Sequence, residues 1–431
     1  MNIAMFTNTY VPHVGGVANS VKSFSDEYRK EGHRVLVIAP EFKHIPPDEK
    51  DVLRIPAIQN FNGSDFSVSL PISMLLSKRI EHFKPDIIHS HHPYLLGDTA
   101  LRMATSLNTP LIFTHHTMYE QYTHYVPLDS PRLQHFILEL STGYANLCNH
   151  VIAPSESTAA ILRRRGVKTP ITVIPTGVEI SRFEYGDGAS IRSEMKIPLN
   201  ALVIGYTGRL AQEKNLEFWA HTVARFLNQV PSGHALIIGD GPFKKMMGEV
   251  FSLNGVESRL HFTGTLSGKK LVNAYYAMDI FVFTSKSETQ GMVLTEAMAA
   301  GLPVVALNAP GIREILRDFE NGRLIEEESI EAFVQAMYWI ISLDSQKLSL
   351  LKEEAKNTAQ TFSLSHCVSQ ALDLYQHLLR GKYITIDFEQ SAWFSILRRI
   401  EEEWCIWSNR FSAAGKAVLS RAPEEQDQTS S

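Results

Sequence analysis

The stretch IFVFTSKSETQGMVLTEAMAAGLPVVAL, residues 280–307, contains the most informative pattern for the fold of this sequence. Its apolar run 280–284 predicts a buried strand, and the polar residues after it lead into a helix that Gly301 and Pro303 end. Residues 303–307 then predict a second buried strand. A helix between two such strands is the connection that a parallel sheet requires, so the sequence predicts an α/β fold.

The same alternation of apolar runs and amphipathic helices extends over most of the chain. Predicted strands cover 2–6, 34–39, 86–89, 110–114, 150–153 and 171–174 in the first half, and 201–206, 234–238, 259–263, 279–284 and 303–307 in the second. Helical stripes lie between them, as in Val17, Val21, Phe24 and Tyr28 and again in Leu216, Trp219, Val223 and Phe226.

A broken stretch at 181–200, with Gly186, Gly188 and Pro198, predicts a connector between two domains. We therefore expect two doubly wound, Rossmann-like domains that face a cleft, followed by a C-terminal helical extension. The predicted divisions are 1–185 for the first domain, 186–360 for the second, 361–387 for a helix that returns toward the first domain, and 388–431 for an amphipathic helix and a polar tail.

Composition excludes several classes of protein. The 431 residues are 44% hydrophobic, which is enough for two ordinary cores, and 41 basic against 46 acidic residues give no general sign of a nucleic-acid-binding protein. Three widely spaced cysteines, Cys148, Cys367 and Cys405, form neither a disulfide framework nor a metal-ligand pattern. The chain begins directly as a strand, and no apolar run approaches the roughly 20 residues of a membrane span. These features predict a cytoplasmic protein.

The first candidate site lies in the opening stretch, at the end of a strand, where ligands of open parallel sheets bind. Gly291 lets a ligand approach the backbone, and the free amides of Met292 and Val293 suit anionic oxygens. Glu288 in the loop and Glu296 on the helix are placed to accept hydrogen bonds from sugar hydroxyls on either side of a phosphate. The alternative is an ordinary helix start with a favourable glutamate beside it.

The second candidate site follows the first strand of the second domain. Arg209 and Lys214 stand in the loop where a diphosphate needs cations, although solvated surface charge is the alternative. Gly239 and Gly241, after the next strand, are further candidates for contact with the nucleotide. Lys244 occupies the position of the third glycine of a dinucleotide turn, so this motif is weak support for NAD.

The first domain has a glycine pair of its own, Gly15 and Gly16, between its first strand and helix, where either phosphate contact or a plain tight turn fits. Histidines gather at strand ends, at His89, His91, His92, His115 and His116. Alternating residues on a strand point to opposite faces and no carboxylate accompanies these histidines, so we expect hydrogen-bonding histidines rather than a metal site.

Together these residues resemble a known family. The Gly15-Gly16-Val loop, Ile174-Pro-Thr-Gly-Val178, the Gly208-Arg-Leu-x3-Lys214 stretch and the Glu288-x7-Glu296 pair are similar to the motifs of retaining glycosyltransferases of family 4, which have the GT-B fold. The resemblance covers roughly residues 1–380. It implies a hexosyltransferase that needs no permanently bound cofactor and no metal, with a nucleotide sugar as donor.

The resemblance also implies residue roles. Arg209 and Lys214 would hold the donor diphosphate, Glu296 the ribose and Glu288 the transferred sugar, while either His115 or His116 would approach the sugar and phosphate from the first domain. No Asp-x-Asp pair occurs in the chain, so the cations and helix amides would stabilise the leaving group. Retention would proceed by front-side attack, because no carboxylate is a convincing nucleophile.

The wording Glu-Thr-Gln-Gly at 288–291, where many members have Glu-Gly-Phe-Gly, together with residues 116–125, is similar to bacterial diacylglycerol glucosyltransferases. That similarity implies UDP-glucose as donor, a lipid acceptor such as diacylglycerol and peripheral association with the inner face of the cell membrane. The alternatives are another acceptor, such as a polysaccharide precursor, phosphatidylinositol or a small metabolite, a sugar-nucleotide epimerase, or a non-catalytic sugar-binding module.

Four segments are candidates for membrane contact. They are the aromatic stretch 117–126, the amphipathic stretch 68–83, the basic run 163–165 and a tryptophan-rich helical stripe at 391–411. Core aromatic residues, solvated charge, and packing of the last helix on protein are the alternatives.

Overall fold

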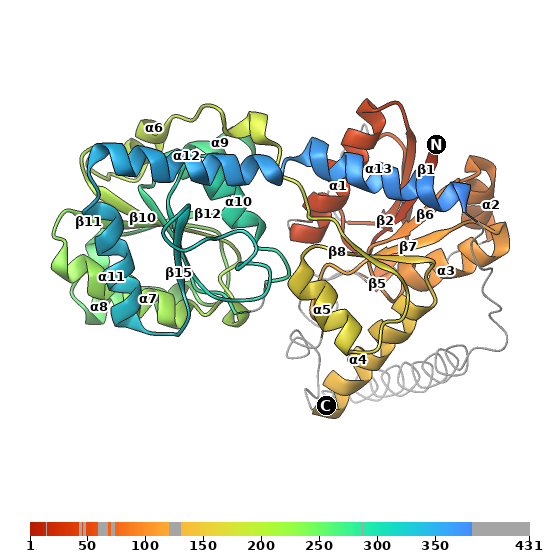
Figure 1. The fold of residues 1–431 in the computed structure, drawn as a ribbon, viewed down its shortest axis with the longest axis horizontal. Helices are drawn as coiled ribbons and strands as arrows, with labels where there is room; N and C mark the ends of the chain where they lie inside the picture. The colour runs from red at the N-terminus through yellow and green to blue at the C-terminus, as the bar shows by residue number, and fades with distance from the viewer. Residues whose placement is uncertain are drawn as a thin grey trace, which may run out of the picture. The chain divides into compact units, whose positions relative to one another are not determined.

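The computed structural model describes residues 1–13, 15–42, 45, 49–58, 68–69, 74–119, 131–286 and 288–381, and it contains two parallel sheets (Figure 1). The predicted stripe 391–411 lies outside these residues, as do residues 120–126 of the aromatic stretch and residues 70–73 of the amphipathic stretch that were proposed for membrane contact.

The first domain is built on a seven-stranded parallel sheet with the order β3-β2-β1-β6-β7-β8-β9. Its strands are β1 (Asn2–Phe6), β2 (Arg34–Pro40), β3 (Val52–Ile55), β6 (Ile87–Ser90), β7 (Leu111–Thr114), β8 (His150–Ala153) and β9 (Ile171–Val173). Its helices are α1 (Gly16–Lys30), α2 (Met74–Phe83), α3 (Leu96–Leu107), α4 (Pro131–Asn146) and α5 (Glu156–Arg164), and β4 (Ala57–Ile58) pairs with β5 (Val68–Ser69) in a separate antiparallel ribbon.

The second domain repeats the architecture on a six-stranded sheet with the order β12-β11-β10-β13-β14-β15. Its strands are β10 (Leu202–Thr207), β11 (Gly233–Ile238), β12 (Leu260–Gly264), β13 (Ile280–Phe283), β14 (Val304–Leu307) and β15 (Gly322–Ile325). Its helices are α6 (Gly188–Glu194), α7 (Leu216–Gln229), α8 (Lys244–Leu253), α9 (Gly268–Tyr276), α10 (Met292–Ala299), α11 (Ile330–Ile341) and α12 (Ser345–Thr361), with single 3-10 turns η3 (Ile180–Phe183), η4 (Gln212–Lys214) and η5 (Glu257–Arg259).

The predicted α/β fold with two Rossmann-like domains is confirmed, and each predicted strand matches an observed one to within about one residue. No strand was predicted at β3 or β15, which are four-residue strands at sheet edges, or at the two-residue strands β4 and β5. In β3 and β15 an arginine, Arg54 or Arg323, interrupts an already short apolar run, so the strand pattern is weak. The stretch 181–200, which is predicted to be a connector between domains, contains most of η3 and all of α6.

The burial of α7 shows how apolar spacing becomes packing. All four residues of its predicted stripe are fully buried, and the indole Nε1 of Trp219 donates to the carbonyl of Val282 on β13 at 2.9 Å. This bond satisfies the one polar atom of the largest side chain in the core. It also fixes α7 against the strand whose following loop carries Glu288.

The last described helix, α13 (Leu364–Arg380), packs on α1 and joins the core of the first domain (Figure 1). In the buried interior the hydroxyl of Tyr375 lies 3.0 Å from that of Tyr28 and 2.6 Å from His89 Nδ1. The helix before it, α12, packs instead against α10 of the second domain. The last two described helices therefore pack on different domains, α12 on the second and α13 on the first.

Candidate active site

The ends of β10 and β13 bring Lys214 and Glu288 together. The Nζ of Lys214 lies 2.6 Å from Oε1 of Glu288, and the two side chains are 17% and 15% exposed. Between the same loops, the Thr284 hydroxyl donates to the Asn215 carbonyl at 3.1 Å. Two residues 74 positions apart, predicted to serve the same donor, thus form one ion pair in a largely desolvated place. Arg209 precedes Lys214 on the loop after β10, and its side chain is exposed.

Helix α10 begins beside this pair with no side-chain cap. Gly291 is its N-cap residue and has a left-handed backbone, with φ of 78°. The left-handed conformation favours glycine, whereas the nearest atom to a Cβ, Cδ1 of Ile312 at 2.6 Å, is the end of a side chain that can move. Met292 and Val293 follow as its first two helical residues, half-buried, and the amides of an uncapped helix start attract anions.

Glu296, one turn further along α10, accepts a hydrogen bond from the Tyr275 hydroxyl at 2.7 Å. Burial raises the pKa of Glu296, while the Tyr275 bond and the nearby Arg182 act in the opposite direction. One carboxylate oxygen therefore has a fixed partner. Tyr275 was not predicted, because it lies on α9 and no local motif connects it to α10.

Gly239 and Gly241 have a packing role in the structure. Their φ angles are 137° and 153°, and a Cβ on either would lie 2.0 Å from the Gly208 carbonyl oxygen or 2.3 Å from that of Leu210, respectively. The two loops are also joined backbone to backbone, since Leu210 N donates to the Asp240 carbonyl at 2.9 Å. These glycines fix the loop that carries Arg209, and contact with a nucleotide stays a prediction for them.

The histidines of the first domain form a buried cluster at the ends of β6 and β7. His91 Nδ1 lies 2.9 Å from His116 Nε2 with the rings stacked, and His89 Nε2 lies 2.6 Å from the Thr114 hydroxyl. Burial lowers the pKa of His89 and His92 to about 3 and that of His116 to about 4. The rings are therefore neutral near pH 7, and they act as hydrogen-bonding groups rather than cations.

His115 and His116 differ in their surroundings. His115 is 1% exposed, burial lowers its pKa to about 3, and neither ring nitrogen has a hydrogen-bond partner among the described residues. His116 is half-buried, and its carbonyl oxygen accepts a bond from the Thr289 hydroxyl at 2.9 Å. Since Thr289 directly follows Glu288, this geometry favours His116 as the histidine beside the donor.

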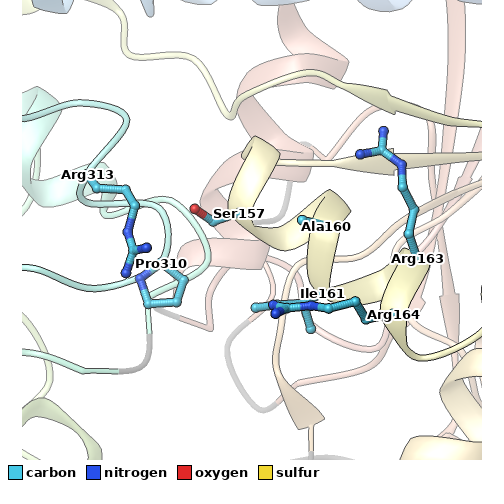
Figure 2. Close-up of a pocket in the computed structure, with 7 residues that line it drawn as sticks. All are labelled: Ser157, Ala160, Ile161, Arg163, Arg164, Pro310 and Arg313. Atoms are coloured by element: carbon cyan, nitrogen blue, oxygen red, sulfur yellow. The ribbon is translucent and has the colours of Figure 1, made fainter.

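A surface pocket of about 510 Å³ lies between α5 and the loop after β14 (Figure 2). Arg163 and Arg164 of the basic run line it together with Arg313, and Arg163 is paired with Glu156 at 2.6 Å. None of the predicted catalytic or donor-binding residues lines this pocket. The pocket gives no information on membrane contact, so a membrane role for the basic run stays a prediction.

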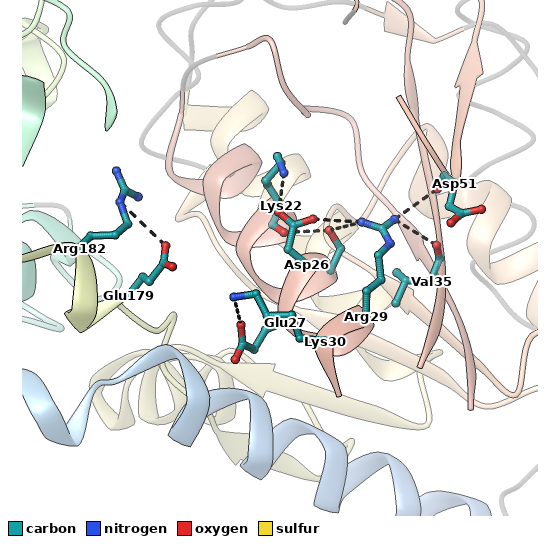
Figure 3. Close-up of polar contacts among 10 residues, drawn as sticks. Lys22, Asp26, Glu27, Arg29, Lys30, Val35, Asp51, Glu179 and Arg182 are labelled. Carbon is teal, nitrogen blue, oxygen red and sulfur yellow. Dashed lines mark hydrogen bonds and ion pairs between the residues drawn. The ribbon is translucent and has the colours of Figure 1, made fainter. Parts of the chain in front are cut away.

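The glycine pair of the first domain lies at the start of α1, with Gly15 as an uncapped N-cap residue and Gly16 as the first helical residue. Arg54 fixes the preceding loop, because its Nη2 donates to the Val11 carbonyl at 2.6 Å. At the other end of α1, Arg29 donates to the Val35 carbonyl at 3.1 Å and so ties the helix to β2 (Figure 3). The glycine pair thus sits at the start of a firmly held helix, and its contact with a phosphate stays a prediction.

Within the described ranges, no group of three or more histidines, cysteines and carboxylates is arranged to hold a metal ion. No helix in the part of the chain that the structure describes has the length and apolarity needed to cross a membrane.

Comparison with known proteins identifies the family. Residues 14–182 match the family Glycosyltransferase Family 4, and residues 188–358 match the family Glycosyl transferases group 1. The chain is 29% identical to an alpha-monoglucosyldiacylglycerol synthase of Streptococcus pneumoniae, over 81% of each chain. It is 28% identical to a GDP-mannose-dependent alpha-mannosyltransferase of Corynebacterium glutamicum, over 79% of this chain and 81% of the relative.

A crystal structure of Anabaena Alr3699/HepE in complex with UDP and glucose has the same fold, with a TM-score of 0.71 and 21% identity, over 88% of this chain and all of that one. The two family matches together span most of both domains, and they agree with the fold and with the resemblance found in the motifs. The chain therefore belongs to glycosyltransferase family 4 and is a hexosyltransferase of the GT-B fold that uses a nucleotide-sugar donor.

Proposed function

We propose that this enzyme transfers glucose from UDP-glucose to a diacylglycerol-type membrane lipid, with retention of the anomeric configuration. The observation that carries the donor half of the proposal is the Lys214–Glu288 ion pair beside the uncapped start of α10. A cation, a set of free amides and a carboxylate acceptor are the three kinds of group that a sugar diphosphate requires.

In this proposal Lys214 and Arg209 hold the diphosphate together with the amides of Met292 and Val293. The leaving diphosphate gains negative charge as the glycosidic bond breaks, so these groups lower the barrier by stabilising that charge. Glu288 accepts from hydroxyls of the sugar, and Glu296, whose carboxylate Tyr275 holds in place, accepts from the ribose.

His116 acts from the first domain as a neutral group. With a pKa of about 4 it carries no charge near pH 7, so its ring supports the sugar by a hydrogen bond and not by attraction to the phosphate. Front-side attack by the acceptor hydroxyl then delivers its proton to the leaving phosphate oxygen. No separate base is needed, because the leaving group itself accepts the proton.

The acceptor half of the proposal is supported by relatives. The Streptococcus pneumoniae relative is named as a synthase of alpha-monoglucosyldiacylglycerol, and a further relative with the same name comes from Acholeplasma laidlawii, at 26% identity over 75% of this chain. A lipid acceptor implies that the protein works at a membrane surface, which we place at the cytoplasmic face.

A mannosyl donor is the second candidate, because the Corynebacterium glutamicum relative is named as GDP-mannose-dependent and is nearly as similar. Purified protein should be incubated with UDP-glucose or GDP-mannose, in the presence of vesicles that contain dioleoylglycerol. We expect a glucosylated lipid of the corresponding mass from UDP-glucose, α-linked by NMR. Product from GDP-mannose alone, or a β-linked product, would reject the proposed donor or the proposed retention, respectively.

A further inference from the structure

We infer that Thr289 and Gln290 are positioning residues, whose polar groups join the donor loop of the second domain to three segments of the first domain, one of which carries His116. The inference rests on the proposed function for its catalytic meaning, since it assumes that Glu288 and His116 act on one donor. These two residues are the positions at which the sequence departs from the Glu-Gly-Phe-Gly wording of many family members.

The side chain of Gln290 pairs with both backbone polar groups of Thr176. Its Oε1 accepts from Thr176 N at 2.6 Å, and its Nε2 donates to the Thr176 carbonyl at 2.7 Å. Gln290 is 3% exposed and Thr176 is 6% exposed. Because water has little access to either residue, loss of one partner leaves a buried polar group unsatisfied.

Thr289 makes the second set of contacts. Its carbonyl oxygen accepts from the Ser155 hydroxyl at 2.7 Å and from the Thr158 hydroxyl at 3.2 Å, at the start of α5. Its own hydroxyl donates to the His116 carbonyl at 2.9 Å. Thr289 therefore contacts the segment that places the predicted histidine, one residue after the predicted sugar-binding carboxylate.

The loop 289–290 also packs closely against the backbone of its own domain. A Cβ on Gly311 would lie 2.7 Å from the carbonyl carbon and oxygen of Thr289 and from the Gln290 amide, so this glycine permits close backbone approach. The loop 289–290 is therefore enclosed on one side by the second domain and bonded on the other to three segments of the first. This enclosure sets the separation between Glu288 and His116.

A positioning role has a distinct kinetic signature. The groups proposed to bind UDP all belong to the second domain, so breaking these bonds should leave UDP affinity nearly unchanged. The donor bound beside Glu288 should be less well aligned with His116 of the first domain, and this loss of alignment should lower kcat. A purely structural role would instead lower stability without this division between binding and turnover.

The variants are Thr289→Val, which removes one hydroxyl at constant shape, and Gln290→Met, which removes both amide bonds. Thr289→Ser keeps the hydroxyl and is the conservative rescue. Thr105→Val is the matched control, because the Thr105 hydroxyl bonds the Leu101 carbonyl within its own helix, α3, at 3.0 Å.

With UDP-glucose and dioleoylglycerol vesicles, we expect kcat to fall about fivefold in Thr289→Val and about 30-fold in Gln290→Met. These fold-changes correspond to the usual net free energy of one and of two hydrogen bonds. The dissociation constant of UDP should change by less than about twofold. Thr289→Ser and Thr105→Val should behave like the wild type. Unchanged kcat in both test variants, or a matching loss of UDP affinity, would overturn the inference.

Hydrogen exchange on the protein without ligands separates this inference from the proposed function. The Thr176 amide should exchange slowly in the wild type and much faster in Gln290→Met, because Gln290 is its bonding partner. A wild type that makes no glucosylated lipid would reject the proposed acceptor, while this exchange difference would still support the link between the loops. Equal exchange in the two proteins would overturn the inference whatever the acceptor.

Discussion

Replacing Lys214 with methionine tests whether this cation serves the donor or only balances Glu288. The two possibilities predict different effects on stability and on turnover. The pair is 2.6 Å apart and about one-sixth exposed, so an unpaired Glu288 should lower the free energy of unfolding by about 2–3 kcal/mol, toward the lower end for a broken buried pair. If Lys214 also stabilises the leaving diphosphate, kcat should fall by about 10²–10³.

The double variant Lys214→Met with Glu288→Gln separates these effects. Removing both charges eliminates the unpaired carboxylate, so chemical denaturation should return to within about 1 kcal/mol of the wild type. Turnover of UDP-glucose should stay low, because the cation is still missing, and Arg209→Lys measured in parallel should show a milder loss. If the double variant recovered both stability and kcat, the role of Lys214 at the diphosphate would be refuted.

Three further outcomes follow from the structure. Lowering the pH from 7 to 5 should reduce the free energy of unfolding by about 2 kcal/mol for each of His89 and His115, as urea denaturation would show. Their pKa of about 3 when folded lies below the ordinary 6.5, so the unfolded chain binds more protons and stability is lost as pH falls below 6.5; a flat profile would contradict this. Gly239→Ala should lower stability by more than about 2 kcal/mol, since its Cβ would meet a backbone carbonyl at 2.0 Å, whereas Gly248→Ala, with open space around it in α8, should be neutral or stabilising. His116→Ala should lower kcat at least about tenfold with UDP binding retained, and the reverse ranking against His115→Ala would show that the wrong histidine has been chosen.

Much of the fold could be predicted because it depends on local patterns. Each buried strand is a short apolar run, and the stripe on α7 leads directly to the buried face that holds Trp219. The strands β3 and β15 were not predicted because each has only four residues with an arginine among them, Arg54 or Arg323, so neither forms a recognisable apolar run.

The candidate site was predictable only in part. The sequence placed Lys214 and Glu288 in loops at strand ends and Glu296 on the helix that follows. Because the carboxyl ends of parallel strands share one edge of the sheet, it is consistent that Lys214 and Glu288 lie 2.6 Å apart. The sequence had no means of finding Tyr275 beside Glu296, or the bond between Gln290 and Thr176, since those partners are joined by tertiary packing across 21 and 114 positions.

The donor site would be tested most sharply by a crystal structure of the protein with UDP. We expect the diphosphate within hydrogen-bonding distance of Lys214 Nζ and of the first amides of α10, with the ribose on Glu296. A nucleotide bound instead at the glycine pair of the first domain, or away from both sheets, would show that these residues do not form the donor site.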